Sequence, residues 1–220
     1  QRGPADLDAP GLVSMCVSNP ELQREIVRRW QEERKKHPGE FVPLQLGEND
    51  ILAYCTCDDC RALDGPQPTE AEVAAMPPYV RGMYKPMNVG RRYAIFWKRV
   101  YELAAQTDPD VVATALVYLN YFDCPDDVTL NKNIVLCFVP WGGWWYPRDP
   151  REQAWLRDQW QRWRRTGASL QYRPNYTFNG ASMPHVYAHQ MADFFQFSVR
   201  QGSVGTDFDM LNGQWAVNGT

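Results

Sequence analysis

The chain has 220 residues, of which 44% are hydrophobic and 22% charged, a composition typical of a globular domain with a buried core. Its 23 basic and 26 acidic residues give a net charge of −3, which excludes the strongly positive field of a nucleic-acid-binding domain. No apolar run approaches the ~18 residues that a membrane span needs. We expect one domain over residues 1–220, cut at both ends from a longer protein, because the chain starts without Met in a polar, proline-containing stretch.

The first half of the chain predicts two strands, one helix and a long irregular stretch. The apolar run 12–17 predicts a strand, and Asn19 and Pro20 directly after it are typical of the cap and first residue of a helix. Apolar residues at helical spacing continue this helix up to a Pro-Gly break, after which 41–46 predicts the next strand. Residues 48–88 are rich in Cys and Pro and predict a long excursion.

The second half repeats the alternation of helix and strand. Apolar residues at helical spacing predict a helix over 93–103, and nearly continuous apolar runs predict strands over 111–119 and 134–139 that are covered on both faces. The remaining predicted elements are a helix from 149 to 167, a strand over 168–172, a helix over 183–198 and a final strand over 202–208.

This strict order of strands and helices predicts an α/β fold with parallel strands joined by right-handed crossovers. A doubly wound sheet and a barrel both satisfy it. The absence of a Gly-rich phosphate turn after the first strand, and the unusual residues that follow nearly every strand, favour a TIM-type (β/α) barrel. About six of its eight strands are predicted here, so we expect about two strands to precede Gln1.

Polar and aromatic side chains follow the predicted strands, and the carboxyl ends of barrel strands converge on one face. Aromatic residues make up 13% of the chain. Rings stack on the apolar faces of sugars, while carboxylates, amides and guanidinium groups hydrogen-bond their hydroxyls. The predicted substrate-binding residues are Asn49, Tyr121, Asp123, Trp141, Trp144, Trp145, Tyr172, Arg173 and Asp209.

Glu48 and Asp50 are the predicted catalytic residues, because they follow a strand end where a carboxyl group can point into the mouth of a barrel. Glycosidic cleavage needs a protonated acid at the leaving oxygen and a second group opposite, which is often a carboxylate about 5–9 Å away. Asp123, Asp207 or Asp209 could supply that carboxylate. The structural alternative is that Glu48 and Asp50 cap the next segment or hold the long loop by hydrogen bonds.

Four cysteines have the most specific spacing in the sequence. Cys55, Cys57 and Cys60 form a C-x-C-x-x-C cluster, and Cys16 ends the first predicted strand. Four thiols that meet could bind a structural Zn²⁺, form disulfides in an exported protein, or remain reduced. A redox-catalytic role is disfavoured, because the acidic neighbours between Cys57 and Cys60 raise rather than lower the pKa of a thiol.

Two segments carry a resemblance to a known family. The segments CVSNPELQ (16–23) and NDILAYCTCDDC (49–60), with the aromatic strand ends in the same order, resemble the family called domain of unknown function 4838. Its members are mainly bacterial, often large, multidomain and exported, and it is similar to barrel glycoside hydrolases such as hexosaminidases and α-glucuronidases. The resemblance implies a barrel entered near its third strand, with Asp50 near the acid that follows the fourth strand. Those hydrolases carry an adjacent acidic pair, whereas Asn49 separates Glu48 from Asp50 here.

The expected function is therefore a glycoside hydrolase that acts on a polysaccharide or glycoconjugate. The alternatives are a non-catalytic glycan-binding barrel and a scaffold domain of a larger carbohydrate-processing protein. The expected partners are a carbohydrate substrate and further domains of the same chain, without nucleic acid or a membrane span. Catalysis is expected to need no cofactor, a structural zinc is one of the alternatives for the four cysteines, and the expected location is secreted or periplasmic.

Overall fold

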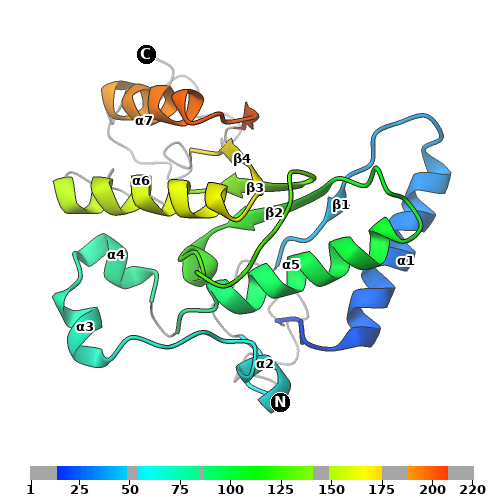
Figure 1. The fold of residues 1–220 in the computed structure, drawn as a ribbon, viewed down its shortest axis with the longest axis horizontal. Coiled ribbons are helices and arrows are strands. Elements are labelled where there is room, and N and C mark those ends of the chain that lie inside the picture. The colour runs from blue at the N-terminus through cyan, green and yellow to red at the C-terminus, as the bar shows by residue number, and fades with distance from the viewer. Residues whose placement is uncertain (1–13, 49–53, 85–86, 141–148, 175–187, 208–220) are drawn as a thin grey trace, which may run out of the picture.

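The computed structural model describes residues 14–48, 54–84, 87–140, 149–174 and 188–207, and it confirms the α/β class. Five strands form one parallel sheet in the order in which they occur in the sequence (Figure 1). The central pair is the longest, with a register that runs from Ala113 opposite Ile134 to Val117 opposite Phe138. The strands are β1 (Leu44–Gln45), β2 (Ala113–Val117), β3 (Ile134–Phe138), β4 (Ser169–Tyr172) and β5 (Gly205–Thr206).

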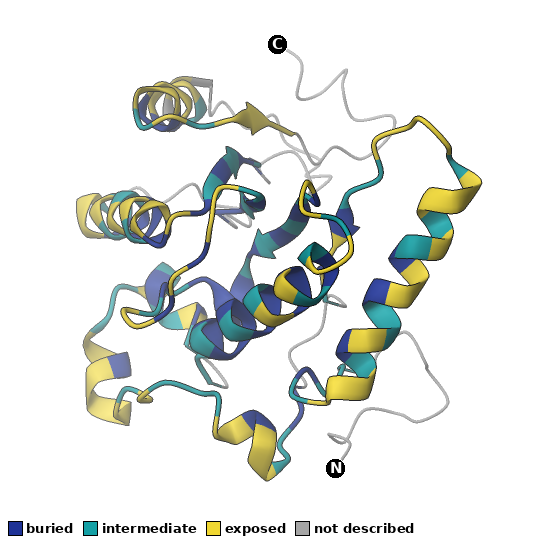
Figure 2. Ribbon diagram, turned by 45° about the vertical axis from the view of Figure 1, so that its right-hand side comes forward, coloured by how far each residue is buried: buried dark blue, intermediate teal, exposed yellow. Residues whose placement is uncertain are grey.

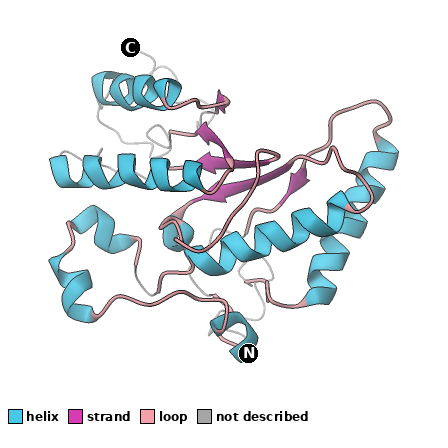
Figure 3. Ribbon diagram, viewed as in Figure 1, coloured by secondary structure: helices cyan, strands magenta, loops and turns pink. Residues whose placement is uncertain are grey.

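Four long helices follow one another around this sheet in chain order (Figures 1 and 3). They are α1 (Pro20–Lys36), α5 (Gly90–Ala105), α6 (Pro150–Arg165) and α7 (Ala188–Arg200). Between β1 and α5 lie three short helices, and β2 is followed by a single 3-10 turn. These short elements are α2 (Asp58–Arg61), α3 (Glu70–Ala75), α4 (Pro78–Gly82) and η2 (Leu119–Tyr121). No helix within the described ranges is both long and apolar enough to cross a membrane.

The helix ends agree with the signals in the sequence. The Asn19 side chain accepts a hydrogen bond from the backbone N–H of Glu21, and Pro20 occupies the first position of α1. Asp149 caps α6 in the same way. Beyond the end of α6, Gly167 has a φ of +97°, which a residue without a Cβ adopts at little cost.

The helices bury aromatic side chains against the sheet and against one another. Trp97 of α5 lies 5.7 Å from Trp163 of α6, and Trp160 of α6 lies 6.4 Å from Phe197 of α7, measured between ring centroids. All four rings are at most 7% exposed. Figure 2 shows the buried side of α5 turned toward the strands and exposed residues on the outer side of α1. Each such side chain contributes about 1.5–3 kcal/mol through removal of apolar surface from water.

The sheet itself is fully covered on one face. In β2 and β3 buried residues alternate with residues of intermediate exposure, so the other face is partly covered, whereas the sequence predicted cover on both faces. Ala113, Ala115 and Val117 are at most 3% exposed, whereas Thr114 and Leu116 between them are partly exposed. Because successive side chains of a strand point to opposite faces, the helices cover the first set.

The strand predicted over 12–17 is absent from the part of it that the structure describes, residues 14–17. Their backbone groups bond elsewhere: the Cys16 carbonyl accepts from the N–H of Asn19 in a turn, and the N–H of Met15 points to the Glu48 carboxylate. An apolar run shows that a segment is buried, but the destination of its backbone hydrogen bonds decides whether it joins a sheet. The helix predicted from 183 is described from Ala188 onward.

Candidate active site and four-cysteine centre

Glu48 lies three residues beyond β1, at the carboxyl edge of the sheet, and its side chain is half-buried. The Tyr93 hydroxyl of α5 donates a 2.8 Å hydrogen bond to its Oε2, and the Met15 N–H lies 3.4 Å from its Oε1. The two donors come from segments far apart in sequence. Together they orient the carboxylate at the strand end.

Tyr93 is a buried part of an aromatic cluster beside this carboxylate. Its ring is 2% exposed, stacks on Tyr121 with 4.7 Å between centroids, and meets Tyr54 edge-on at 6.1 Å. Burial raises the pKa of the Tyr93 phenol, and the nearby charge of Glu48 raises it further. Tyr93 therefore stays protonated and remains a hydrogen-bond donor throughout the physiological pH range.

The turn that places Tyr121 in this cluster is strained. Leu119, two residues beyond β2, adopts a φ of +46°, a left-handed conformation that costs a non-glycine residue about 1–2 kcal/mol. Asn120 holds the turn: its side-chain N–H donates to the Met87 carbonyl at 2.6 Å, and its own carbonyl accepts from the Val89 N–H at 2.8 Å. The strain is thus maintained by contacts with the segment that leads into α5.

Four cysteines form a second cluster close to Glu48. The Sγ atoms of Cys16, Cys55, Cys57 and Cys60 all lie within 4.8 Å of one another. The Cys16 Sγ is 3.7 Å from that of Cys57 and 3.9 Å from that of Cys60. The Ser18 hydroxyl lies 3.1 Å from the Cys60 Sγ. The four cysteines that their spacing singled out therefore lie together in space.

Local structure positions each of these thiols. Cys57 caps α2 and Cys60 lies within it, while the turn before α1 carries Cys16. The guanidinium of Arg92 donates to the Cys55 carbonyl at 2.7 Å and forms a two-point ion pair with Asp64 at 2.8 and 2.6 Å. The Arg92 side chain is 1% exposed, so these contacts satisfy a charge that water cannot reach.

The thiols differ in acidity, and the expectation of a raised thiol pKa beside Asp58 and Asp59 is wrong for Cys57. The backbone N–H of Cys60 donates to the Cys57 Sγ and lowers the pKa of Cys57 to about 6. Burial raises the pKa of Cys55 to about 12 and also raises that of Cys60. Without a cation, burial therefore opposes the formation of four thiolates in one place.

The family model called Domain of unknown function (DUF4838) matches residues 4–215. The chain belongs to the DUF4838 family. No curated protein sequence and no solved structure matches it. The match includes both the Cys16 segment and the C-x-C-x-x-C cluster, so the two halves of the four-cysteine centre lie inside the DUF4838 region.

Some predicted substrate-binding residues of this DUF4838 chain have protein partners. Asp123 accepts hydrogen bonds from Asn88, Gln159 and Arg162, each at 2.9 Å, and so joins its loop to α6. Tyr172 is the last residue of β4 and is fully buried, with its ring 5.0 Å from that of Phe194. In this arrangement three protein donors bond to the Asp123 carboxylate, and Tyr172 is buried in the core.

Other predicted residues of the DUF4838 chain lie at the carboxyl edge or outside the described ranges. Arg173 and Asp207 form an ion pair at 3.6 Å beyond the ends of β4 and β5. Tyr121 is buried and stacks on Tyr93, whose hydroxyl bonds to Glu48. The predicted residues outside the described ranges are Asn49, Asp50, Trp141, Trp144, Trp145 and Asp209.

Sequence reasoning missed Tyr93, Arg92 and Ser18. Tyr93 contacts Glu48, 45 positions away in the sequence, and Arg92 contacts Cys55, 37 positions away. No local sequence pattern predicts such distant pairs. Ser18 had a weak signal, because it lies two residues from Cys16 in a segment already predicted to approach the cluster.

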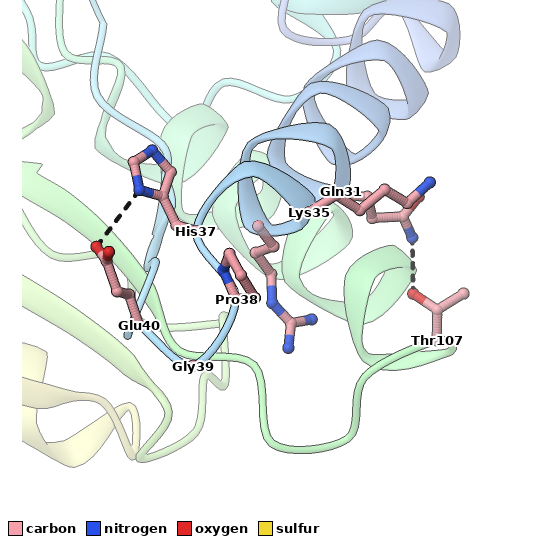
Figure 4. A pocket seen from close by; sticks show the side chains of 8 residues that line it. Gln31, Lys35, His37, Pro38, Gly39, Glu40 and Thr107 are labelled. Carbon is pink, nitrogen blue, oxygen red and sulfur yellow. Dashed lines mark hydrogen bonds and ion pairs between the residues drawn. The ribbon is translucent and has the colours of Figure 1, made fainter.

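An open hollow of about 420 Å³ lies at the opposite edge of the sheet, where the chain enters β1 (Figure 4). Its lining includes Arg34, Lys35 and His37, and a hydrogen bond of 2.9 Å from Gln31 to Thr107 crosses one side of it. In α/β folds with parallel strands, this edge contributes to stability and chemistry occurs at the carboxyl edge. The hollow is therefore not the candidate active site.

Proposed function

We propose that this DUF4838 chain is part of a (β/α) barrel that binds and cleaves carbohydrate at the carboxyl ends of its strands. Asp50 would be the general acid, and Glu48 the neighbouring carboxylate that orients the substrate or assists the reaction. The observation that carries this proposal is the half-buried Glu48 beyond β1, held by the hydroxyl of Tyr93 at 2.8 Å.

The strand order supports the barrel. A doubly wound sheet reverses its strand order at a switch point, and its helices cover both faces. The described strands of this sheet run in sequential order, all parallel, and the four long helices follow in the same order. When the strand order does not reverse, right-handed crossovers place all the helices on the same face of the sheet. A barrel requires this arrangement, because its helices lie outside its strands.

The surroundings of Glu48 support a site rather than a simple loop anchor. Two donors fix the carboxylate, and the strained backbone of Leu119 lies in the neighbouring strand-end turn. Strained residues cluster at functional sites, where the structure maintains a geometry that the local sequence does not favour. Trp141, Trp144 and Trp145, which follow β3 in sequence, remain the predicted surface for stacking on sugar rings.

The chemistry assigned to this site is acid-assisted glycosidic hydrolysis. The proton of the Asp50 carboxyl group passes to the bridging oxygen as the bond from the anomeric carbon to that oxygen breaks. A water molecule then supplies hydroxide to the anomeric carbon, and its remaining proton restores the acid. An oriented carboxylate such as Glu48 can stabilise the positive charge that develops on the sugar ring.

The test is a screen of aryl glycosides and aryl uronides with the purified protein, followed by substitution of the acids. Asp50→Asn is expected to lower the rate by about 10²–10⁴-fold and to leave the melting temperature nearly unchanged, because the amide keeps the shape but cannot donate the proton. Asp110→Asn is the matched control, since Asp110 is an exposed carboxylate in the loop before β2.

Two results would contradict the proposal. Activity that survives both Asp50→Asn and Glu48→Gln would remove these residues from the site. Glycan binding without cleavage of any substrate would indicate a binding barrel instead of an enzyme.

A further inference from the structure

We propose that Cys16, Cys55, Cys57 and Cys60 bind one Zn²⁺ ion as a structural tetrathiolate centre. This metal site is independent of the proposed carbohydrate chemistry, since no step of that reaction needs the ion. Its basis is the convergence of four thiols from two segments that are about forty residues apart in the sequence.

The spacing of the sulfur atoms fits a single tetrahedral ion. With Zn–S bonds of about 2.3 Å, the sulfurs of a tetrahedral site stand about 3.8 Å apart. The Cys16 Sγ lies 3.7 Å from that of Cys57 and 3.9 Å from that of Cys60. A disulfide would bring one pair to about 2.05 Å, and all four cysteines are free thiols in the structure.

The ligand set selects the kind of metal. Ca²⁺ and Mg²⁺ take oxygen ligands, whereas four thiolates in a tetrahedron suit Zn²⁺ or iron. A cubane iron–sulfur cluster attaches its cysteines to different iron atoms around a larger core, so its thiolates stand farther apart than these. Zn²⁺ has no redox chemistry and closes structural sites of this type.

The surroundings of the thiols are those of a supported metal centre. The Cys60 N–H donates to the Cys57 Sγ at 3.4 Å, and the Ser18 hydroxyl is 3.1 Å from the Cys60 Sγ. Such hydrogen bonds orient metal ligands and stabilise their charge. Binding of Zn²⁺ releases the thiol protons to solvent, and the ion compensates the charge that burial would otherwise make unfavourable.

The ion would stabilise the segments that contact Glu48. Met15, which donates toward the Glu48 carboxylate, is adjacent to the ligand Cys16. Tyr93, the other donor, is adjacent to Arg92, which holds the carbonyl of Cys55. Zinc would therefore join the segment that carries Met15 to residues 55–60, and Arg92 connects residues 55–60 to the helix that carries Tyr93.

The test begins with the metal content of the purified protein, measured by mass spectrometry of the elements. We expect one zinc per chain in the wild type. Cys60→Ser is expected to lose the ion, because a hydroxyl replaces one of four thiolates. Cys137→Ser is the matched control: it also removes one thiol, but Cys137 lies in β3 and outside the cluster, so this variant is expected to keep its zinc.

A second measurement keeps the test decisive if Cys60→Ser does not fold. The wild-type protein is stripped of metal under reducing conditions and titrated with Co²⁺, which absorbs strongly when thiolates surround it tetrahedrally. We expect thiolate-to-cobalt absorption that saturates at one ion per chain and that Zn²⁺ abolishes. The proposal is overturned by a metal-free protein that takes up neither ion, by iron at one per chain, or by an intact mass lower by two hydrogens for each disulfide.

Discussion

The Tyr93 hydroxyl donates a 2.8 Å hydrogen bond to Glu48, although the two residues are 45 positions apart in sequence. The preceding residue of the same helix, Arg92, reaches the carbonyl of Cys55 at 2.7 Å. Helix α5 thus contacts the candidate catalytic carboxylate and the four-cysteine centre through two consecutive side chains. A change at either site is therefore expected to affect the other through α5.

Tyr93→Phe tests the bond to Glu48. The ring keeps its packing against Tyr121, but the carboxylate loses the 2.8 Å hydrogen bond from the hydroxyl. We expect the free energy of unfolding to fall by about 1.5–3 kcal/mol, the usual range for a hydrogen bond to a charged group. Urea denaturation measures it.

The control for this change is Tyr101→Phe on the same helix. The Tyr101 hydroxyl accepts only a long 3.4 Å bond from Asn133, so a cost below about 1 kcal/mol is expected. Equal costs for the two substitutions would mean that the contact between Tyr93 and Glu48 contributes nothing specific.

Asp64→Ala tests the buried ion pair beside the cysteines. It leaves the Arg92 guanidinium without its carboxylate in a site where only 1% of that side chain is exposed. Breaking a buried pair by removal of one partner costs about 3–5 kcal/mol. The same denaturation experiment on Asp193→Ala provides the comparison, because the pair of Asp193 with Arg157 is 53% and 30% exposed and should contribute less than about 1 kcal/mol. A small loss for Asp64→Ala would contradict the structural role of Arg92.

Gly90→Ala tests the close approach at the start of α5. An added Cβ would lie 2.0 Å from the backbone oxygen of Asp123, so one of the two backbone segments must move. We expect a loss of about 1–3 kcal/mol in thermal or urea unfolding. Gly82→Ala in α4 is the control, since its Cβ would meet nothing within 4 Å, and a neutral or slightly stabilising effect is expected. A tolerated Gly90→Ala would disprove the contact between this helix start and the Asp123 loop.

Thiol reactivity in metal-free protein tests the acidities of Cys57 and Cys124. The pKa of Cys57 is lowered to about 6 by the Cys60 N–H, whereas burial raises that of Cys124 to about 12. Because the thiolate is the reactive form, alkylation of Cys57 should rise between about pH 5 and pH 8 and then level off. Cys124 should stay unlabelled over that range while the protein is folded. Peptide mass spectrometry after a short iodoacetamide pulse measures both, and equal labelling rates would refute the assignment.

Elements with strong local signals could be predicted from the sequence. Asn19 with Pro20, and Asp149 with Pro150, marked the starts of α1 and α6 through capping chemistry that depends only on neighbouring residues. The apolar runs at β2 and β3 were equally clear. The prediction of a strand at 14–17 is wrong because the backbone of this segment bonds within a turn and to Glu48 instead of to a neighbouring strand. An apolar sequence does not show which partners its backbone groups will have.

The site was predictable only in part, for a related physical reason. The sequence grouped Cys16 with Cys55, Cys57 and Cys60, and the four thiols lie together in the structure. Contacts such as that between Tyr93 and Glu48 depend on how helices are placed against strand ends. That placement is fixed by packing of the whole core, so no local pattern reveals it.

X-ray absorption at the zinc K edge of the purified protein is the most direct measurement of the four-cysteine centre. Coordination by Cys16, Cys55, Cys57 and Cys60 predicts four sulfur neighbours at about 2.3 Å and no nitrogen or oxygen ligand. Oxygen or nitrogen neighbours at about 2.0–2.2 Å, or a zinc signal that persists in Cys60→Ser with four sulfurs, would show that the ion is bound elsewhere.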